Sequence, residues 1–156
     1  MADYDAMRRP GERPTRSLDF IMHKQIYVNL AVDDLERSKA FFSTIGFSFE
    51  AQFTNGQAAC LILGENLYAM LLVKDLFKSF TRKSLCNPKE STEALVGLSC
   101  ESRGEVDALV AKALAAGGTV PRAPQDYGFM YGHGFEDIDG HIWELIYMDP
   151  NAKAAG

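Results

Sequence analysis

The sequence IYVNLAVDDLERSKAFF, which occupies residues 26–42, carries the pattern that decides the fold. Alternation along its first seven residues predicts a β-strand whose apolar face is formed by Ile26, Val28, Leu30 and Val32. The next two residues, Asp33 and Asp34, are typical helix N-caps, and apolar residues then recur at helical spacing. The stretch therefore predicts a strand that leads directly into a helix, which Gly46 terminates.

A second strand and helix repeat this arrangement later in the chain. Val96 lies 68 residues after Val28 and opens another alternating run, which predicts a strand over 95–100. Residues 105–116 are rich in Ala, Val and Leu and predict a helix, and two glycines at 117 and 118 end it. The chain thus contains two similar units.

Three further strands are expected in each unit. In the first they cover 47–53, 58–63 and 67–73, with a hairpin turn at Asn55-Gly56. In the second, a short strand begins near Thr119 and is stopped by prolines, and a hairpin spans 129–148 around Asp139-Gly140. The order βαβββ, insert, βαβββ predicts an α+β fold, with two modules whose sheets form a cupped mixed sheet around a central cleft.

The same pattern sets the expected domain boundaries. Residues 1–22, rich in charge, Pro and Gly, are expected to form a flexible extension, and 151–156 a tail. A single domain is expected over 23–150, with module one at 25–73, a helical insert at 74–92 and module two at 93–149. Within the insert, apolar residues at helical spacing predict a short amphipathic helix around Leu76, Phe77 and Phe80.

Composition excludes several classes of function. The 156 residues carry a net charge of −5 and no clustered basic face, so we expect no nucleic-acid partner. No apolar run reaches the length of a membrane span, so we expect no membrane partner. The three cysteines, at 60, 86 and 100, form no CxxC pair, which is typical of a reduced cytoplasmic protein.

Two motifs connect the chain with a known family. They are VNLAVDDLERS at 28–38, with Phe41-Phe42 and Gly46-Phe47 after it, and FEDIDGHIWEL at 135–145, in which Ile138 stands where the family has Pro. Over residues 24–149 the chain resembles the vicinal oxygen chelate superfamily, which includes glyoxalase I, bleomycin- and fosfomycin-resistance proteins and extradiol dioxygenases. It looks closest to members labelled lactoylglutathione lyase-like. The resemblance implies the fold more strongly than the reaction, because this fold hosts many chemistries.

The resemblance also implies a metal mechanism, in which His and Glu hold a divalent ion that takes two substrate oxygens. The positions that match the four usual ligands are Tyr27, Met70, Leu95 and Glu144. Only Glu144 is a conventional ligand for a hard divalent ion, whereas about three protein ligands are usual in a catalytic site. We therefore predict no tightly bound metal and no cofactor.

Two alternatives stay open for this site. A shift of two residues places Glu93, rather than Leu95, at the ligand position. His133 shares strand parity with Phe135, which favours packing against a helix, yet the glycines on both sides of it permit a bulge that would turn it to the cleft. A metal site built from Glu144, Glu93 and His133 is the alternative to the metal-free one.

The sequence therefore predicts a homodimeric glyoxalase/bleomycin-resistance-like protein that binds a small, partly apolar organic molecule. Glu144 is the candidate catalytic residue, as a general base or hydrogen-bond acceptor. The candidate ligand-binding residues are Tyr27, Asn29, Met70, Leu95 and Tyr127. The protein either sequesters the molecule or acts on it. The alternatives are a metal-dependent lyase or isomerase of the glyoxalase I type and a non-catalytic regulatory or interaction module.

Overall fold

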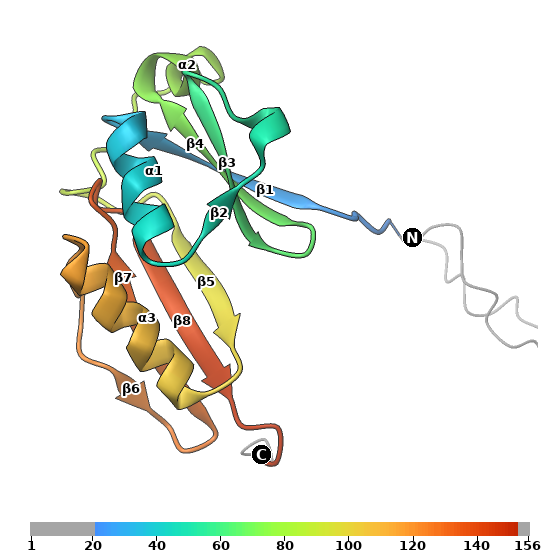
Figure 1. Ribbon diagram of the computed structural model, residues 1–156, viewed down its shortest axis with the longest axis vertical. Coiled ribbons are helices and arrows are strands. Elements are labelled where there is room, and N and C mark those ends of the chain that lie inside the picture. Colours follow the sequence, from blue (N-terminus) through green and yellow to red (C-terminus); the bar gives the residue numbers. More distant parts are fainter. Residues whose placement is uncertain (1–20, 153–156) are drawn as a thin grey trace, which may run out of the picture.

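The computed structural model describes residues 21–152 and contains two modules that succeed one another along the chain (Figure 1). The first module consists of β1 (Ile26–Val32), α1 (Leu35–Thr44), β2 (Ser48–Phe49), the 3-10 turn η2 (Ala51–Phe53), β3 (Ala58–Gly64) and β4 (Leu67–Val73). The short helix α2 (Lys74–Ser79) follows it. The second module consists of β5 (Leu95–Cys100), α3 (Arg103–Ala115), β6 (Gln125–Asp126), β7 (Met130–Glu136) and β8 (Ile142–Met148).

Each module contributes one four-stranded mixed sheet. The strand orders are β1-β4-β3-β2 and β5-β8-β7-β6, so both sheets have the same topology. In each, the opening strand runs parallel to the closing strand, and the remaining pairs are antiparallel. In Figure 1, α1 and α3 cover the same side of their sheets. The predicted α+β fold with two βαβββ modules is confirmed.

Side-chain caps begin both long helices, at Asp34 as the sequence predicts and at Ser102, where no cap was predicted. The Asp34 carboxylate accepts a hydrogen bond from the backbone N–H of Arg37 at 3.1 Å and caps α1. The Ser102 hydroxyl accepts one from the backbone N–H of Glu105 at 3.0 Å and caps α3. Gly46 and Gly117, just past the helix ends, have positive φ values of 106° and 105°. These conformations suit glycine, so both helices stop there.

Two elements are shorter than the sequence predicts. The strand expected over 47–53 is only Ser48–Phe49, because the Glu50 carboxylate accepts from the backbone N–H of Gln52 and starts η2 instead. The strand expected near Thr119 is a single bridge to Glu136. Local side-chain bonding and the prolines after Thr119 compete with ladder formation at these two sheet edges.

One hydrophobic core joins the two modules. Phe42 of α1 meets Trp143 of β8 edge to face, with ring centroids 5.2 Å apart, and both side chains are fully buried. Phe41 lies against Phe135 of β7 at 6.1 Å. Aromatic side chains bury the largest apolar areas in a core. The helix of the first module therefore packs against the sheet of the second.

Beside this core lies a buried polar seam, formed by the hairpin turn between β7 and β8. Asp137 accepts hydrogen bonds from the backbone N–H groups of Asp139, Gly140 and His141 and from the indole N–H of Trp143, at 2.9 to 3.1 Å. Burial raises the pKa of the Asp137 carboxyl, and the N–H donors around it oppose that shift. The family motif at 135–145 thus stabilises the turn between β7 and β8.

The same turn fastens the second module to the first and to the insert. Asp139 accepts a hydrogen bond from the backbone N–H of Asp33 at 2.9 Å. Gly140 has φ +98°, and a Cβ there would lie 2.8 Å from the carbonyl oxygen of Pro88. Only glycine suits both the backbone conformation and this close approach. The insert therefore passes directly over the turn.

The predicted helix of the insert is present as α2. It follows β4 without a break, and Lys74 at its start pairs with Asp33, which lowers the pKa of that carboxyl. The division into an extension, one domain and a tail remains a prediction, and most of the expected extension, residues 1–20, lies outside the described residues. None of the helices between residues 21 and 152 has the length and apolar character needed to cross a bilayer.

Candidate functional site

The two sheets each have one face packed under the helices and one face turned away from them, which we call the open face. On β1 the helix-side residues Leu30 and Val32 are buried, whereas Tyr27 and Asn29, of opposite parity, are exposed. In the second module Trp143 and Leu145 are buried on the helix side, and Glu144 between them points to the open face. The open face therefore carries the candidate site residues.

The register shows how the two open faces correspond. Asn29 pairs with Met70 in the first sheet, and Gly97 pairs with Glu144 in the second. Asn29 and Gly97 are separated by the same 68 residues as the two opening strands. Met70 and Glu144 therefore occupy equivalent places, one apolar and one acidic.

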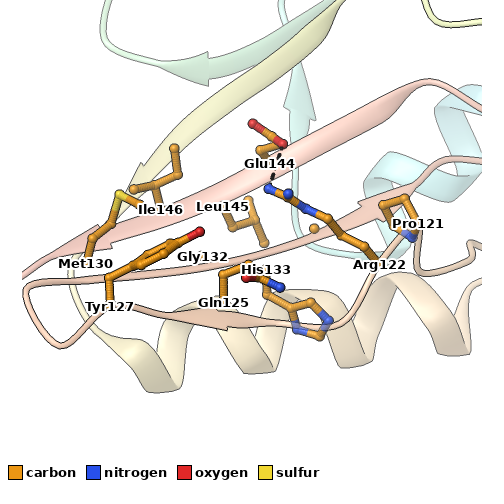
Figure 2. Close-up of a pocket in the computed structure, with 11 residues that line it drawn as sticks. Pro121, Arg122, Gln125, Tyr127, Met130, Gly132, His133, Glu144, Leu145 and Ile146 are labelled. Atoms are coloured by element: carbon orange, nitrogen blue, oxygen red, sulfur yellow. Dashed lines mark hydrogen bonds and ion pairs between the residues drawn. The ribbon is translucent and has the colours of Figure 1, made fainter.

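Glu144 lines a pocket on the open face of the second sheet (Figure 2). The pocket has a volume of about 140 Å³, and Glu144 is half-buried at its edge. Its floor lacks side chains at Gly132 and Gly134, because a glycine stands opposite Ile146 and another opposite Glu144. The walls combine polar and apolar groups, chiefly Arg122, Gln125, Tyr127, Met130 and Ile146.

Arg122 provides the positive charge in this pocket. It extends from the loop before β6, and its guanidinium Nη2 lies 3.4 Å from Glu144 Oε1 (Figure 2). The Arg122 side chain is 67% exposed and that of Glu144 is 29% exposed. The pair is monodentate and long, so it is a weak ion pair that a bound molecule is able to break.

A network on the outer surface holds the loop that carries Tyr127. The Arg103 guanidinium donates to both carboxylate oxygens of Asp126, at 2.6 and 3.0 Å, and to the carbonyl oxygen of Gly128 at 3.1 Å. It also lies 5.1 Å from the ring centre of Tyr131. This pairing lowers the pKa of Asp126. Arg103 thereby positions one wall of the pocket without touching the pocket itself.

A second pocket lies on the open face of the first module. It has a volume of about 370 Å³ and is lined by Asn29 of β1 and by Phe77, Phe80 and Thr81 of the insert. Phe80 is 73% exposed. The insert, which has no counterpart in the second module, therefore adds aromatic surface beside Asn29.

The candidate ligand-binding residues fall into separate places within one chain. Tyr127 and Glu144 line the same pocket, whereas Asn29 lines the pocket of the first module. Tyr27 stacks on Tyr68, with ring centroids 5.1 Å apart, and is 45% exposed. Met70 is half-buried in β4 and Leu95, 57% exposed, pairs with Ile142 at the start of β5.

The two alternative ligands do not join Glu144 in a common site, although His133 also borders the Glu144 pocket. His133 is nearly buried on the helix side of β7, 3.9 Å from the Asp107 carboxylate of α3, as its parity with Phe135 predicts. A Glu93 carboxylate oxygen lies 2.7 Å from His141 Nδ1, and the other ring nitrogen, Nε2, lies 2.6 Å from the carbonyl oxygen of Ala31. His141 is 4% exposed and belongs to the seam between the modules.

These donors do not fit the divalent metal that the resemblance implies. Within residues 21–152 no three His, Cys, Asp or Glu side chains are grouped so that they could share an ion. The charged neighbour of Glu144 is the Arg122 guanidinium, which repels a metal cation from that carboxylate. The metal-free site stays a prediction, now with a positive group identified beside the acid.

Sequence reasoning missed Arg122 and Gln125. Arg122 lies in the loop before β6 and Gln125 begins β6, in a region where Pro121 and Pro124 predict only the end of a strand. Prolines restrict the backbone on both sides of Arg122, and a cationic residue in such a restricted loop is the signal in the sequence that could have indicated a binding role. The pairing with Glu144, 22 residues away, is visible only in the fold.

Known proteins resemble this chain in sequence and in fold. Residues 24–64 match the family model of the bleomycin resistance protein-like N-terminal region. A hypothetical protein from S. aureus is 30% identical, with a TM-score of 0.68, and the match covers 81% of this chain and 95% of that one. No curated protein matches the sequence significantly.

Solved structures of named family members share the fold. A glyoxalase/bleomycin resistance protein/dioxygenase family enzyme from Burkholderia phytofirmans is 19% identical with a TM-score of 0.65, covering 79% of this chain and 97% of that one. The fosfomycin resistance protein FosX from Listeria monocytogenes is 21% identical with a TM-score of 0.60, covering 85% and 97%. Together with the repeated βαβββ modules, these findings show that the chain belongs to the glyoxalase/bleomycin resistance/dioxygenase family, the vicinal oxygen chelate superfamily.

Proposed function

We propose that the protein binds a small, partly apolar organic molecule on the open face of the second sheet, against Glu144. The observation that carries the proposal is the pocket at the closing strand, where one half-buried carboxylate lies among apolar walls. Ligand pockets characteristically combine apolar surface with a few polar groups that orient the ligand. Met130 and Ile146 supply the first kind of surface, and Gln125 and Tyr127 supply the second.

Glu144 gives the pocket two chemical capacities without a resident metal. As a carboxylate it accepts a hydrogen bond from a hydroxyl or amine of the bound molecule. It also has the chemistry of a general base, which removes a proton from a group within hydrogen-bond reach. Binding alone sequesters the molecule, and proton removal transforms it. The same residue therefore serves either mode, and product analysis of a bound compound separates the two.

We further propose that two chains form a homodimer in which open faces meet. Tyr27 and Leu95 are large apolar side chains on these faces, and 45% and 57% of their surfaces are exposed. The pockets of the two modules are separate within one chain, so a second copy is what would bring Asn29 and Met70 opposite Glu144. The three free cysteines support a reducing, cytoplasmic location.

A fragment screen followed by backbone amide chemical shifts tests the binding proposal. Binders are expected to shift the amides of Gly132 and Gly134, and Glu144→Gln is expected to weaken those with a hydroxyl or amine about tenfold. Gly132→Leu blocks the pocket, because a Cβ at Gly132 meets only the Leu145 carbonyl, at 3.9 Å, and its side chain would point to the open face. Gly104→Leu, on the exposed start of α3, is the matched control.

The outcomes are distinct. Fragments that bind equally well to the protein and to Gly132→Leu would contradict the proposal, as would one tightly held divalent ion per chain in protein purified without a His tag.

Sedimentation velocity tests the proposed dimer. Leu95→Glu is expected to give monomers, whereas Leu114→Glu, which places the same charge on exposed helix surface, is expected to leave the dimer intact.

A further inference from the structure

We propose that Arg122 is the anchor for a carboxylate group on the bound molecule, and that this group replaces Glu144 as the partner of the guanidinium. The inference rests on the proposed function, because it names the class of molecule that the Glu144 pocket accepts. It identifies the ligand as a small organic acid with an apolar body. It also assigns a role to a residue outside the two motifs that carry the family resemblance.

The geometry of the pair leaves the guanidinium available to a ligand. A guanidinium has five N–H donors, and among residues 21–152 Arg122 makes one side-chain hydrogen bond, the 3.4 Å contact with Glu144. The Arg122 side chain is 67% exposed at the mouth of the pocket. Its fork matches the two oxygens of a carboxylate, so a ligand carboxylate is able to form two short bonds in place of one long one.

The backbone of the loop favours a fixed position for this charge. Pro121 and Pro124 restrict φ on both sides of Arg122, and Thr119 is tied to β7 by reciprocal backbone hydrogen bonds with Glu136, at 3.1 and 2.8 Å. The backbone that carries Arg122 therefore loses little freedom when a ligand pairs with the guanidinium.

Accessibility decides between an acidic and a basic ligand. Coulomb repulsion acts on both, since a ligand cation at Glu144 would lie near the guanidinium and a ligand anion at Arg122 would lie near the carboxylate. The Arg122 side chain is 67% exposed and that of Glu144 is 29% exposed, so the guanidinium is the more accessible of the two charged groups. A ligand anion at Arg122 is held by that charge and leaves Glu144 to accept from a hydroxyl, an amine or an acidic C–H group. The guanidinium is the electropositive group of this site, where metal-dependent relatives would use an ion.

Two matched pairs of probes test the inference. Phenylacetate and phenylacetamide share a ring and a methylene group and differ in charge, and mandelate and mandelamide are the same pair with an added hydroxyl. Binding is followed by the amide shifts of Gly132 and Gly134. We expect phenylacetate to bind about tenfold more tightly than phenylacetamide, since hydrogen bonds between charged groups are the stronger ones. Arg122→Gln is expected to reduce this ratio to about one, and Arg122→Lys to about threefold.

Arg37→Gln is the control, because it removes the same charge from the exposed surface of α1 and is expected to leave the ratio unchanged. Equal affinities of phenylacetate and phenylacetamide, or a ratio that Arg122→Gln does not alter, would overturn the inference. The proposed function survives that result if mandelamide still binds more tightly than phenylacetamide and loses the difference in Glu144→Gln. If no probe shifts the two glycine amides at its solubility limit, the organic-acid class is wrong, and the fragment screen decides the proposed function separately.

Discussion

The hydroxyl of Ser38 donates a hydrogen bond to the Asp139 carboxylate across the boundary between the two modules, at 2.8 Å. Both residues are buried, at 0% and 6% exposure, although they are 101 positions apart in the chain. Ser38 lies on the inner face of α1 and Asp139 in the turn between β7 and β8. The turn formed by the family motif of the second module therefore binds the first helix, α1, of the other module.

Removal of the Ser38 hydroxyl is expected to destabilise the whole domain. Ser38→Ala leaves a buried carboxylate oxygen without this donor, which costs about 1–3 kcal/mol. Urea unfolding followed by the fluorescence of Trp143, the one tryptophan in the sequence, measures the loss. Ser43→Ala, on the exposed side of the same helix, is the control and is expected to change stability by less than about 0.5 kcal/mol. Equal effects of the two substitutions would contradict the role of the bond.

His141 and Glu93 are expected to act as a coupled pair in stability. One ring nitrogen of His141 faces the Glu93 carboxylate at 2.7 Å and the other faces the Ala31 carbonyl at 2.6 Å, so the ring connects the segment before β5 and the β7–β8 hairpin of module two with β1 of module one. A double-mutant cycle with His141→Ala and Glu93→Ala is expected to give a coupling energy of about 1–3 kcal/mol. Urea unfolding of the four proteins provides it. Strictly additive effects would show that the contact contributes no stability.

Phe42 is expected to be the costliest single truncation at the module boundary. Phe42→Ala removes a fully buried ring that contacts Trp143 and Phe47, and large-to-small changes of this type cost about 3–5 kcal/mol. The indole of Trp143 then meets a cavity or water, so its fluorescence is expected to shift to longer wavelength in the folded state. Phe53→Ala, at a ring that is 54% exposed, provides the comparison. A folded variant with unchanged emission would contradict this packing.

Acidification is expected to release the loop that carries Tyr127. The Arg103 guanidinium lowers the pKa of Asp126 below its ordinary value of 3.8. The pair therefore stabilises the loop at all pH values above about 3.8, and this contribution is lost as the pH falls through the lowered pKa of the folded protein. Carbon NMR titration of the Asp126 carboxyl follows the change. Arg103→Gln is expected to return the pKa toward its ordinary value and to accelerate amide exchange at Tyr127, whereas Arg37→Gln leaves both unchanged.

The predicted elements that the structure confirms are those with a strong local signal. The strand over 26–32, the cap at Asp34 and the hairpin around Gly140 follow from alternation, capping and turn chemistry, which act between neighbours in the chain. The burial of Trp143 and the helix-side position of His133 follow from strand parity. Where the signal was weak, at 47–53 and near Thr119, the predicted strands were too long.

The sequence by itself determined the two modules, the helix-facing core and the place of Glu144 on the opposite face, because periodicity decides which side of a strand or helix is buried. Only the tertiary structure decided what surrounds that carboxylate. Arg122 reaches Glu144 from a loop at the sheet edge, and Asp139 reaches Ser38 from the other module. Such contacts depend on how sheets and helices pack in three dimensions. Local periodicity shows which side of an element is buried, but it does not show which residues distant in the chain come into contact.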